Sequence, residues 1–129
     1  MTRLLLDTCA LLWFVFDDQR LSQRVDRAIS DGSVEKMVGI CSLWEIVIKQ
    51  QLGKLGLGMR IEEFFDRFVF DRELTVVHLE TEHLLAYSSL PMAHRDPFDR
   101  ILIAQAIHFG VPVATPDSSF DRYDVARVW

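Results

Sequence analysis

Four acidic residues in this sequence occupy places where proteins with parallel sheets gather their functional groups. Asp7 directly follows the apolar run Leu4 to Leu6, and Asp117 lies two residues beyond a later apolar run. Glu45 and Asp99 fall in the first turns of two predicted helices. Because ligands of an open parallel sheet bind outside the carboxyl ends of its strands, we expect these four carboxylates to share one site.

Four carboxylates in one cleft require a positive counter-charge. Two carboxylates about 5 Å apart repel each other by roughly 3 kcal/mol at an effective dielectric constant of about 20. Sites built only from oxygen ligands favour hard cations, and Mg²⁺ or Mn²⁺ combines one or two carboxylates with waters and phosphate oxygens. The sequence therefore predicts Mg²⁺ or Mn²⁺ bound by Asp7, Glu45, Asp99 and Asp117.

Two of these acids also have a structural explanation at the start of a helix. Ser42 and Glu45 form the S-x-x-E pattern of a capping box, and Glu45 has the i,i+4 spacing of an ion pair with Lys49. Asp96 precedes a proline and is suited to cap a helix, whose dipole Asp99 would complement. Taken singly, Glu45 and Asp99 are therefore open to either interpretation.

The remaining two acids differ from each other in this respect. Asp117 is suited to cap a turn over residues 118–120. For Asp7 the pattern indicates no helix or turn that needs an acid, because the segment is apolar through Phe16 apart from Thr8. A carboxylate buried there needs a partner, which makes Asp7 the strongest candidate for a functional role.

The elements that must position these acids alternate between strands and helices. Apolar runs predict strands over residues 4–6, 36–40, 74–77, 111–115 and 125–128. Helical spacing, caps and glycine or proline stops predict helices over residues 10–16, 22–30, 42–52, 61–68, 81–90 and 97–109. This order, without tight hairpin signals, predicts an α/β fold: one domain over residues 1–129, with a central parallel sheet of four to five strands flanked by helices on both faces.

Composition narrows the function classes. The chain has 129 residues, of which 50% are hydrophobic and 26% charged, which suits a single packed domain. Its formal net charge of −5 argues against a protein that merely coats nucleic acid, because such proteins carry a basic stripe. An acidic protein that handles nucleic acid therefore needs metal ions where it touches the phosphates.

The N-terminus and the cysteines give no sign of export or of a zinc site. The apolar stretch from Leu4 to Phe16 contains Asp7, is too short to span a bilayer and is followed by no small-residue cleavage site. Cys9 and Cys41 belong to no C-x-x-C pair and are expected to be buried free thiols. We therefore expect a cytoplasmic protein that does not contact membranes.

Five motifs, met in order along nearly the whole chain, carry a family resemblance. They are LLLDTCALLW at Leu4–Trp13, SLWEIVIK at Ser42–Lys49, GKL at Gly53–Leu55, HRDPFDRILIAQA at His94–Ala106 and TPD at Thr115–Asp117. Together they resemble the PIN-domain proteins of the VapC toxin type. The resemblance implies a single PIN-like domain, a metal-dependent endoribonuclease and the toxin of a type II toxin–antitoxin pair, which forms a homodimer and is blocked by a cognate antitoxin.

The resemblance also implies roles for individual residues. The acidic quartet of the family matches Asp7, Glu45, Asp99 and Asp117, and the accompanying hydroxyl positions match Thr8, Ser42 and Thr115, which would orient carboxylates or metal-bound waters. The implied reaction is attack of a metal-activated water on an RNA phosphodiester. Asp7 and Asp99 are expected to bind metal directly, Glu45 to hold or deprotonate the water, and Asp117 to complete a second or weaker site.

One position departs from the family pattern. Cys9 stands where close relatives often have histidine. The four acids are intact, so the change bears on substrate or metal preference and not on the class of reaction.

Basic residues near the motifs suggest how RNA is bound. No acidic residue interrupts the segment between Glu45 and Glu62, so Lys49, Lys54 and Arg60 are candidate phosphate contacts, with a simply solvated basic loop as an equal alternative. Arg95 and Arg100 flank the acidic motif and could contact phosphate, although we expect Arg100 to hold a carboxylate.

Other functions need features that the sequence does not supply together. A metal-free ribonuclease needs two histidines as acid and base, and no spacing brings His78, His83, His94 or His108 together; His78 and His94 are expected at the surface. A receiver-like signalling domain with a Mg²⁺ site needs a late lysine, and none follows Lys54. A nuclease-dead PIN interaction module would not need all four acids. The aromatic face over residues 61–68 is expected in the core, or else as the seat of a partner helix.

Overall fold

Three consecutive leucines form the centre of the sheet. The computed structural model describes residues 1–129, and Leu4, Leu5 and Leu6 are completely buried in strand β1 (Arg3–Leu6). The other strands are β2 (Glu35–Gly39), β3 (Thr75–Val77), β4 (Val113–Ala114) and β5 (Arg127–Val128), and the order is β3-β2-β1-β4-β5 with every neighbouring pair parallel. The predicted parallel sheet is confirmed, with five strands.

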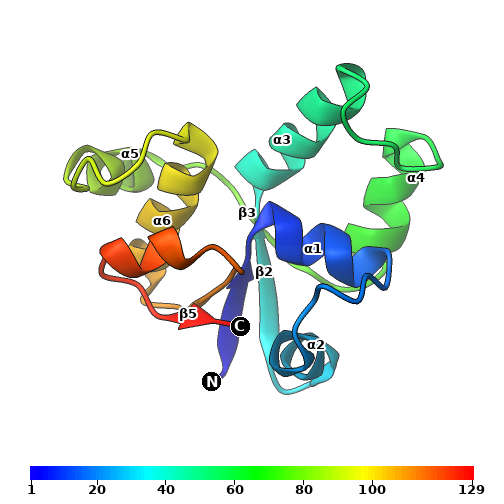
Figure 1. Cartoon of the computed structure of the whole chain (residues 1–129), viewed down its shortest axis with the longest axis horizontal. Helices are drawn as coiled ribbons and strands as arrows, with labels where there is room; N and C mark the ends of the chain where they lie inside the picture. The colour runs from blue at the N-terminus through cyan, green and yellow to red at the C-terminus, as the bar shows by residue number, and fades with distance from the viewer.

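Helices cover both faces of this sheet (Figure 1). They are α1 (Thr8–Val15), α2 (Gln23–Ser30), α3 (Ile40–Gln51), α4 (Ile61–Phe65), α5 (Thr81–Ser88) and α6 (Pro97–Phe109), with a π-helical turn η1 (Asp66–Phe70) and a 3₁₀ turn η2 (Ser118–Arg122). None of the helices is both long and apolar enough to cross a membrane.

The alternating side chains of β1 divide the core into two parts. Leu4 and Leu6 belong to a cluster with α1, α2, α3 and α4, whereas Leu5 belongs to a second cluster with α6. Successive side chains of a strand point to opposite faces, so a central strand covered on both faces needs the unbroken apolar run that the sequence shows. In the first cluster Phe64 is fully buried, which confirms the core interpretation of that aromatic position.

The junction between β2 and α3 has no connecting residue. Strand β2 ends at Gly39 and helix α3 begins at Ile40, so the predicted helix start at Ser42 is two residues late. A Cβ on Gly39 would lie only 3.0 Å from the side-chain oxygen Oε1 of Gln105. Glycine therefore lets the chain pass close to α6 where the strand turns into the helix. Ser42 is a buried residue within the helix, and the predicted capping box with Glu45 is wrong, because no side chain caps this helix.

Helix α6, by contrast, begins and ends where its sequence predicts. The Asp96 carboxylate accepts hydrogen bonds from the backbone N–H groups of Phe98 and Asp99, and Pro97 is the first helical residue. At the other end Gly110 adopts the left-handed conformation with φ of 64°. These two ends fix the position of Asp99 in the first turn of the helix.

The left-handed end of α6 gives a prediction about stability. Gly110→Ala should lower the free energy of unfolding by about 1 kcal/mol, because the left-handed conformation costs a residue with a Cβ about that much. Gly32→Ala is the matched control, since Gly32 has no positive φ and open space around its Cβ position. Urea unfolding of both variants measures the effect; equal stability of the two variants would contradict the role assigned to Gly110.

Candidate active site

A cavity of about 350 Å³ lies at the carboxyl ends of the central strands. Eleven residues line it: Asp7, Thr8, Cys9, Leu12, Trp13, Glu45, Lys49, Asp96, Asp99, Pro116 and Asp117. All four acids singled out in the sequence are among them. The fold thus brings together side chains from the β1–α1 junction, α3, α6 and the segment after β4. Asp7 and Asp117, the two acids that are farthest apart in the chain, are separated by more than a hundred residues.

Asp7 is the most deeply buried of these acids. Only 7% of the residue is exposed, its Oδ1 accepts a 2.6 Å hydrogen bond from the backbone N–H of Ala10, and the Thr115 hydroxyl also hydrogen bonds to it. Burial raises the pKa of Asp7 to about 6, and the nearby charges of Asp99 and Glu45 add to this rise. The cavity therefore holds a carboxylate whose charged form is less favourable than in water and would be stabilised by a positive partner.

Asp7 also has a structural role that the sequence reading missed. It is the N-cap of α1, which begins at Thr8 and not at Ala10 as predicted. The expectation that no helix needs an acid at this position is therefore wrong. Strand β1 and helix α1 are separated by this single residue, so one side chain both caps the helix and faces the cavity.

Glu45 lies in the second turn of α3 and not in the first turn as predicted, because the helix already begins at Ile40; its carboxylate is held from two directions. The Thr8 hydroxyl donates a 2.7 Å hydrogen bond to its Oε1, and Lys49 Nζ lies 3.1 Å from its Oε2. The predicted i,i+4 ion pair is thus present. Lys49 is the only lysine or arginine that lines the cavity, and it already has a carboxylate partner.

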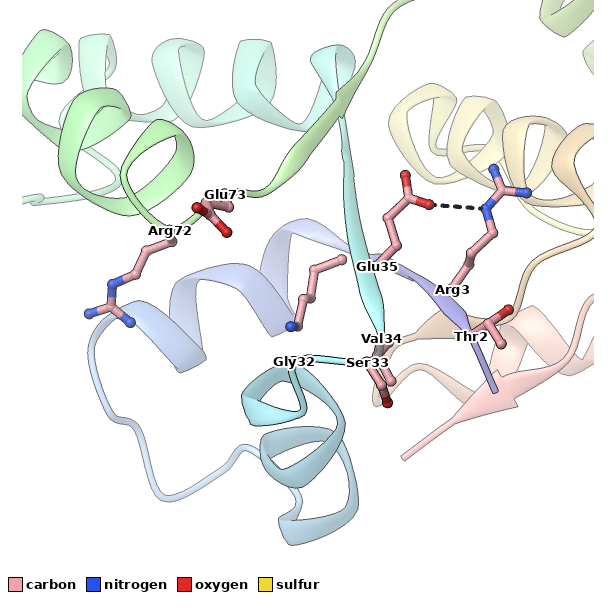
Figure 2. A pocket seen from close by; sticks show the side chains of 9 residues that line it. Thr2, Arg3, Gly32, Ser33, Val34, Glu35, Arg72 and Glu73 are labelled. Atoms are coloured by element: carbon pink, nitrogen blue, oxygen red, sulfur yellow. Dashed lines mark ion pairs between the residues drawn. The ribbon is translucent and has the colours of Figure 1, made fainter.

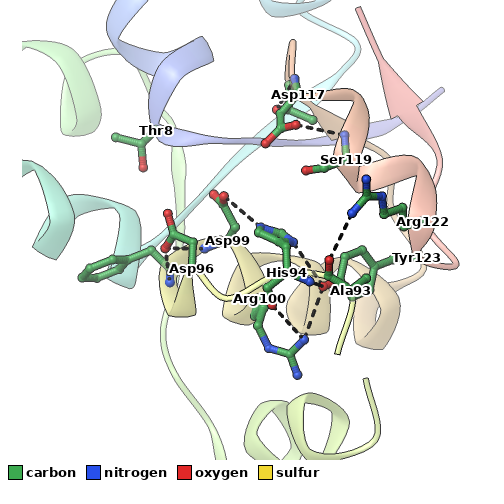
Figure 3. Close-up of polar contacts among 12 residues, drawn as sticks. Thr8, Ala93, His94, Asp96, Asp99, Arg100, Asp117, Ser119, Arg122 and Tyr123 are labelled. Atoms are coloured by element: carbon green, nitrogen blue, oxygen red, sulfur yellow. Dashed lines mark hydrogen bonds and ion pairs between the residues drawn. The ribbon is translucent and has the colours of Figure 1, made fainter. Parts of the chain in front are cut away.

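Asp99 receives its contact from a histidine. Nε2 of His94 lies 3.2 Å from Asp99 Oδ2, as Figure 3 shows. Burial raises the pKa of Asp99, while the hydrogen bond with His94 works in the opposite direction and the charge of Asp96 adds to the rise. Asp7 and Asp99 are therefore both carboxylates that the fold keeps partly desolvated.

Asp117 stands in a different environment from Asp7 and Asp99. It caps the turn η2, where its Oδ1 accepts a 2.9 Å hydrogen bond from the backbone N–H of Ser119, and its own N–H donates to the Thr115 hydroxyl at 3.1 Å. Burial opposes ionisation of Asp117, but hydrogen bonds from Ser119 outweigh it and hold the pKa of this carboxyl below its usual value. Thr115 touches both Asp7 and Asp117 and so links the two central strands at the cavity.

Comparison with known families decides the family of this fold and site. The sequence pattern described as "PIN domain" matches residues 4–126. The chain belongs to the PIN domain family. No curated protein matches it in sequence.

Solved structures with this PIN fold cover almost the whole chain. VapBC2 from Rickettsia felis bound to a DNA fragment from their promoter has a TM-score of 0.70 and 12% identity, over 98% of this chain and 97% of that one. FitAB bound to an IR36 DNA fragment has a TM-score of 0.70 and 18% identity, over 97% of this chain and 93% of that one. FitAcB from Neisseria gonorrhoeae has a TM-score of 0.69 and 17% identity, over 98% of this chain and 96% of that one. At these identities the likeness concerns the fold alone.

The donor set of this PIN domain is compatible with a hydrated divalent cation. No three His, Cys, Asp or Glu side chains stand close enough to enclose a metal ion by themselves. Mg²⁺ keeps several waters and uses one or two carboxylates, so it does not need such an enclosure. The oxygen-only acids, the raised pKa of Asp7 and a cavity wide enough for water all fit an ion of this kind.

Several residues predicted near the site lie elsewhere. Lys54, Arg60 and Arg95 are exposed and do not line the cavity, and Ser42 is buried behind it. Arg100 is 4% exposed, which removes it as an RNA contact. The expectation that it holds a carboxylate is also wrong.

Cysteine and histidine positions also differ from expectation. Cys41 is a buried free thiol as predicted, but Cys9 is only half-buried and lines the cavity, where burial raises its pKa to about 12. His94, expected as an ordinary surface residue, has a side chain only 18% exposed. His83 and His108 pack edge to face with ring centroids 4.9 Å apart, a contact that no spacing predicted, although neither residue lines the cavity.

A larger cavity of about 590 Å³ lies at the other end of the sheet, where β1 and β2 begin (Figure 2). Its charges are mixed: Arg3 and Glu35 face each other at 3.6 Å, and Arg72 and Glu73 follow one another on the opposite wall. It contains none of the four acids. The chemistry therefore concentrates in the smaller cavity at the carboxyl ends.

The raised pKa of Asp7 predicts how stability depends on pH. Between its unfolded value of 3.8 and its folded value of about 6, the folded chain retains a proton that the unfolded chain releases. Ionised Asp7 therefore opposes folding above about pH 6. Asp7→Asn should stabilise the metal-free protein at about pH 8, by roughly 3 kcal/mol at most, and by much less at about pH 4.

Asparagine keeps the cap of α1, so this comparison isolates the charge. Asp26→Asn, an exposed position in the first turn of α2, makes the same charge change and should shift stability by less than about 0.5 kcal/mol. Urea unfolding at both pH values measures the difference. A wild-type chain more stable than Asp7→Asn at about pH 8 would contradict the cost assigned to the buried carboxylate.

Proposed function

We propose that this PIN domain is a Mg²⁺- or Mn²⁺-dependent endoribonuclease of the VapC type, the toxin of a type II toxin–antitoxin pair acting in the cytoplasm. The observation that carries the proposal is the convergence of Asp7, Glu45, Asp99 and Asp117 on one cavity. Burial raises the pKa values of two of these carboxyls, Asp7 and Asp99, and a bound cation would stabilise their charged forms.

The four acids would hold the cation and its waters. When bound there, Mg²⁺ or Mn²⁺ supplies a nucleophilic water of lowered pKa and stabilises the charge that develops on the phosphate. Asp7 and Asp99 are the proposed direct ligands, because they are the carboxylates that most need a counter-charge. Asp117, which the hydrogen bonds of η2 keep ionised, would complete a second or weaker position.

Glu45 is the acid best placed to handle the proton of the attacking water. Thr8 fixes one of its oxygens and Lys49 faces the other, so the carboxylate is oriented before a substrate arrives. Its side chain is 14% exposed, which leaves access for a water. Lys49 is the one lysine or arginine that lines the cavity and is therefore the proposed contact for a scissile phosphate, while Lys54, Arg60 and Arg95 are proposed as contacts with RNA further along the surface.

Protein partners form the remaining part of the proposal. VapBC2 and FitAB are complexes by their names, and we propose that this chain likewise binds a cognate antitoxin and forms a homodimer. An open, mostly apolar cavity of about 500 Å³ supports a protein partner, since apolar surfaces of this kind mark interaction sites. It lies between α3, α5 and α6 and includes Trp44, which is 60% exposed, and Leu84, which is 51% exposed.

The nuclease proposal predicts metal-dependent cleavage. Purified protein should cut single-stranded or loop RNA with Mg²⁺ or Mn²⁺ and not in excess chelator. Asp7→Asn and Asp99→Asn should each lower the cleavage rate by at least about 100-fold, the usual effect of removing a group that stabilises transition-state charge. Gel analysis of RNA products measures this, with Asp26→Asn as the control of equal charge change; full activity of the two site variants, or in chelator, would refute the proposal.

The toxin proposal predicts an effect in cells. Expression of the chain alone in a bacterial host should arrest growth, because an unblocked ribonuclease depletes essential RNA. Asp7→Asn should restore growth at an equal protein level, and Asp26→Asn should not. Growth curves with immunoblots for protein level test this. If wild type and Asp7→Asn arrest growth equally, the harm arises from another surface, and the toxin assignment fails even where cleavage is seen in vitro.

A further inference from the structure

We propose that His94 is a positioning residue for Asp99, and that Tyr123 and Arg100 fix its imidazole in the tautomer with the proton on Nε2. The inference deepens the proposed function, on which it rests for the role of Asp99. It concerns residues behind the carboxylate: His94, Tyr123 and Arg100 do not line the acidic cavity and so are not placed to touch a substrate.

The contact between the ring and the carboxylate is the first step. His94 Nε2 lies 3.2 Å from Asp99 Oδ2. His94 belongs to the segment that precedes α6, and its side chain is only 18% exposed. The structure has no other side chain bonded to the Asp99 carboxylate, and its Oδ1 accepts no hydrogen bond from the protein. The orientation of this carboxylate in the cavity thus depends on one ring nitrogen.

The Tyr123 hydroxyl determines which ring nitrogen carries the proton. Its oxygen accepts from the backbone N–H of His94 at 3.1 Å and from Arg100 Nη1 at 3.3 Å. Both partners are donors only, and a tyrosine oxygen has two acceptor positions and one proton. That proton is therefore available only for a third partner, and His94 Nδ1 lies 3.1 Å from the same oxygen.

The tautomer follows from this count of donors and acceptors. Because the hydroxyl donates to Nδ1, Nδ1 is an acceptor and the single proton of the neutral ring resides on Nε2. Nε2–H then donates to Asp99. A directed chain of hydrogen bonds runs from Arg100 through Tyr123 and His94 to the carboxylate, as the dashed lines in Figure 3 trace.

Arg100 is a rigid start for this chain. It is 4% exposed, and its guanidinium carbon lies 4.9 Å from the centre of the Tyr87 ring. Its Nη1 donates to the carbonyl oxygen of Pro91 at 2.8 Å, and the remaining N–H of this nitrogen is shared between the Tyr123 hydroxyl at 3.3 Å and the carbonyl oxygen of His94 at 3.4 Å. Tyr123 follows η2, the turn that Asp117 caps. The network therefore connects the turn η2, which Asp117 caps, to the helix α6, which carries Asp99. Arg100 would thus hold Tyr123 in place, a role that its position in the sequence motif did not suggest.

Substitutions at His94 separate positioning from simple packing. Glutamine places an N–H at about the reach of Nε2, whereas asparagine places one only at the reach of Nδ1. We expect His94→Gln to bind Mn²⁺ and to cleave RNA within about threefold of wild type, and His94→Asn and His94→Ala to bind Mn²⁺ about 10- to 100-fold more weakly. Calorimetric titration of the full chain with Mn²⁺ alone measures the affinity, and circular dichroism melts identify any variant that does not fold.

The tautomer has a spectroscopic signature that needs neither metal nor RNA. Long-range ¹H–¹⁵N correlation spectra of the ¹⁵N-labelled wild-type chain, recorded at about pH 9 so that the ring carries a single proton, should show His94 protonated on Nε2 and bare on Nδ1. Tyr123→Phe keeps the ring and removes the donor to Nδ1, so it should give a mixture of both tautomers. This measurement tests the inference even if the His94 variants fail to fold.

Each outcome separates the two proposals. Protonation of His94 on Nδ1, or Mn²⁺ affinity of His94→Ala equal to wild type, would overturn the positioning role while leaving the nuclease proposal intact. Equal losses in His94→Gln and His94→Asn would also overturn it, because packing and not the Nε2 donor would then matter. Unchanged cleavage and Mn²⁺ binding in Asp99→Asn would instead refute the proposed function of the site.

Discussion

Burial of the Asp7 carboxylate at the end of the central strand is the constraint on which the rest of this structure depends. The residue is only 7% exposed, and its carboxylate costs free energy whenever it is charged. The fold offsets part of this cost with hydrogen bonds from Ala10 and Thr115. The placement of Glu45 and Asp99 increases it again, because like charges gather at the same edge. The parallel sheet brings these positions together, because the strands β1 and β4 end at the same edge and α3 and α6 also face the cavity there.

Structural and functional explanations of the acids prove to be compatible. Asp7 caps α1 and Asp117 caps η2, yet both line the cavity. A helix that begins directly after a strand points its free N–H groups toward the carboxyl edge of the sheet, so an acid there is stabilised by the backbone and also faces any ligand. From the sequence, helix capping and ligand binding look like alternative roles for Asp7 and Asp117. In the structure each of these residues can have both roles.

Features of the fold that depend on residues close together in the chain could be predicted from the sequence, whereas features that depend on distant contacts could not. The buried leucines, the proline and glycine that bound α6 and the i,i+4 pair of Glu45 are set by neighbours in the chain, and they were predicted. The start of α3 was not, because Gly39 turns against Gln105 of a distant helix. The contact of His94 with Asp99 was missed because it depends on the loop before α6, where no periodic pattern exists. The family motif that contains both residues was the only available signal.

The acids of the cavity divide into two electrostatic classes, and this division bears on how a cation would load. Asp117 has a lowered pKa and is already ionised when Asp7, at about 6, still retains part of its protons. A divalent cation held by Asp117 in this cavity would favour ionisation of the buried Asp7 carboxyl as well. Burial also raises the pKa of Asp99, while the hydrogen bond from the Nε2–H of His94 works in the opposite direction. The His94 donor thus gives Asp99 part of the stabilisation that Ala10 and Thr115 give Asp7, and because the pKa values of both carboxyls remain raised, both would still gain from a positive charge in the cavity.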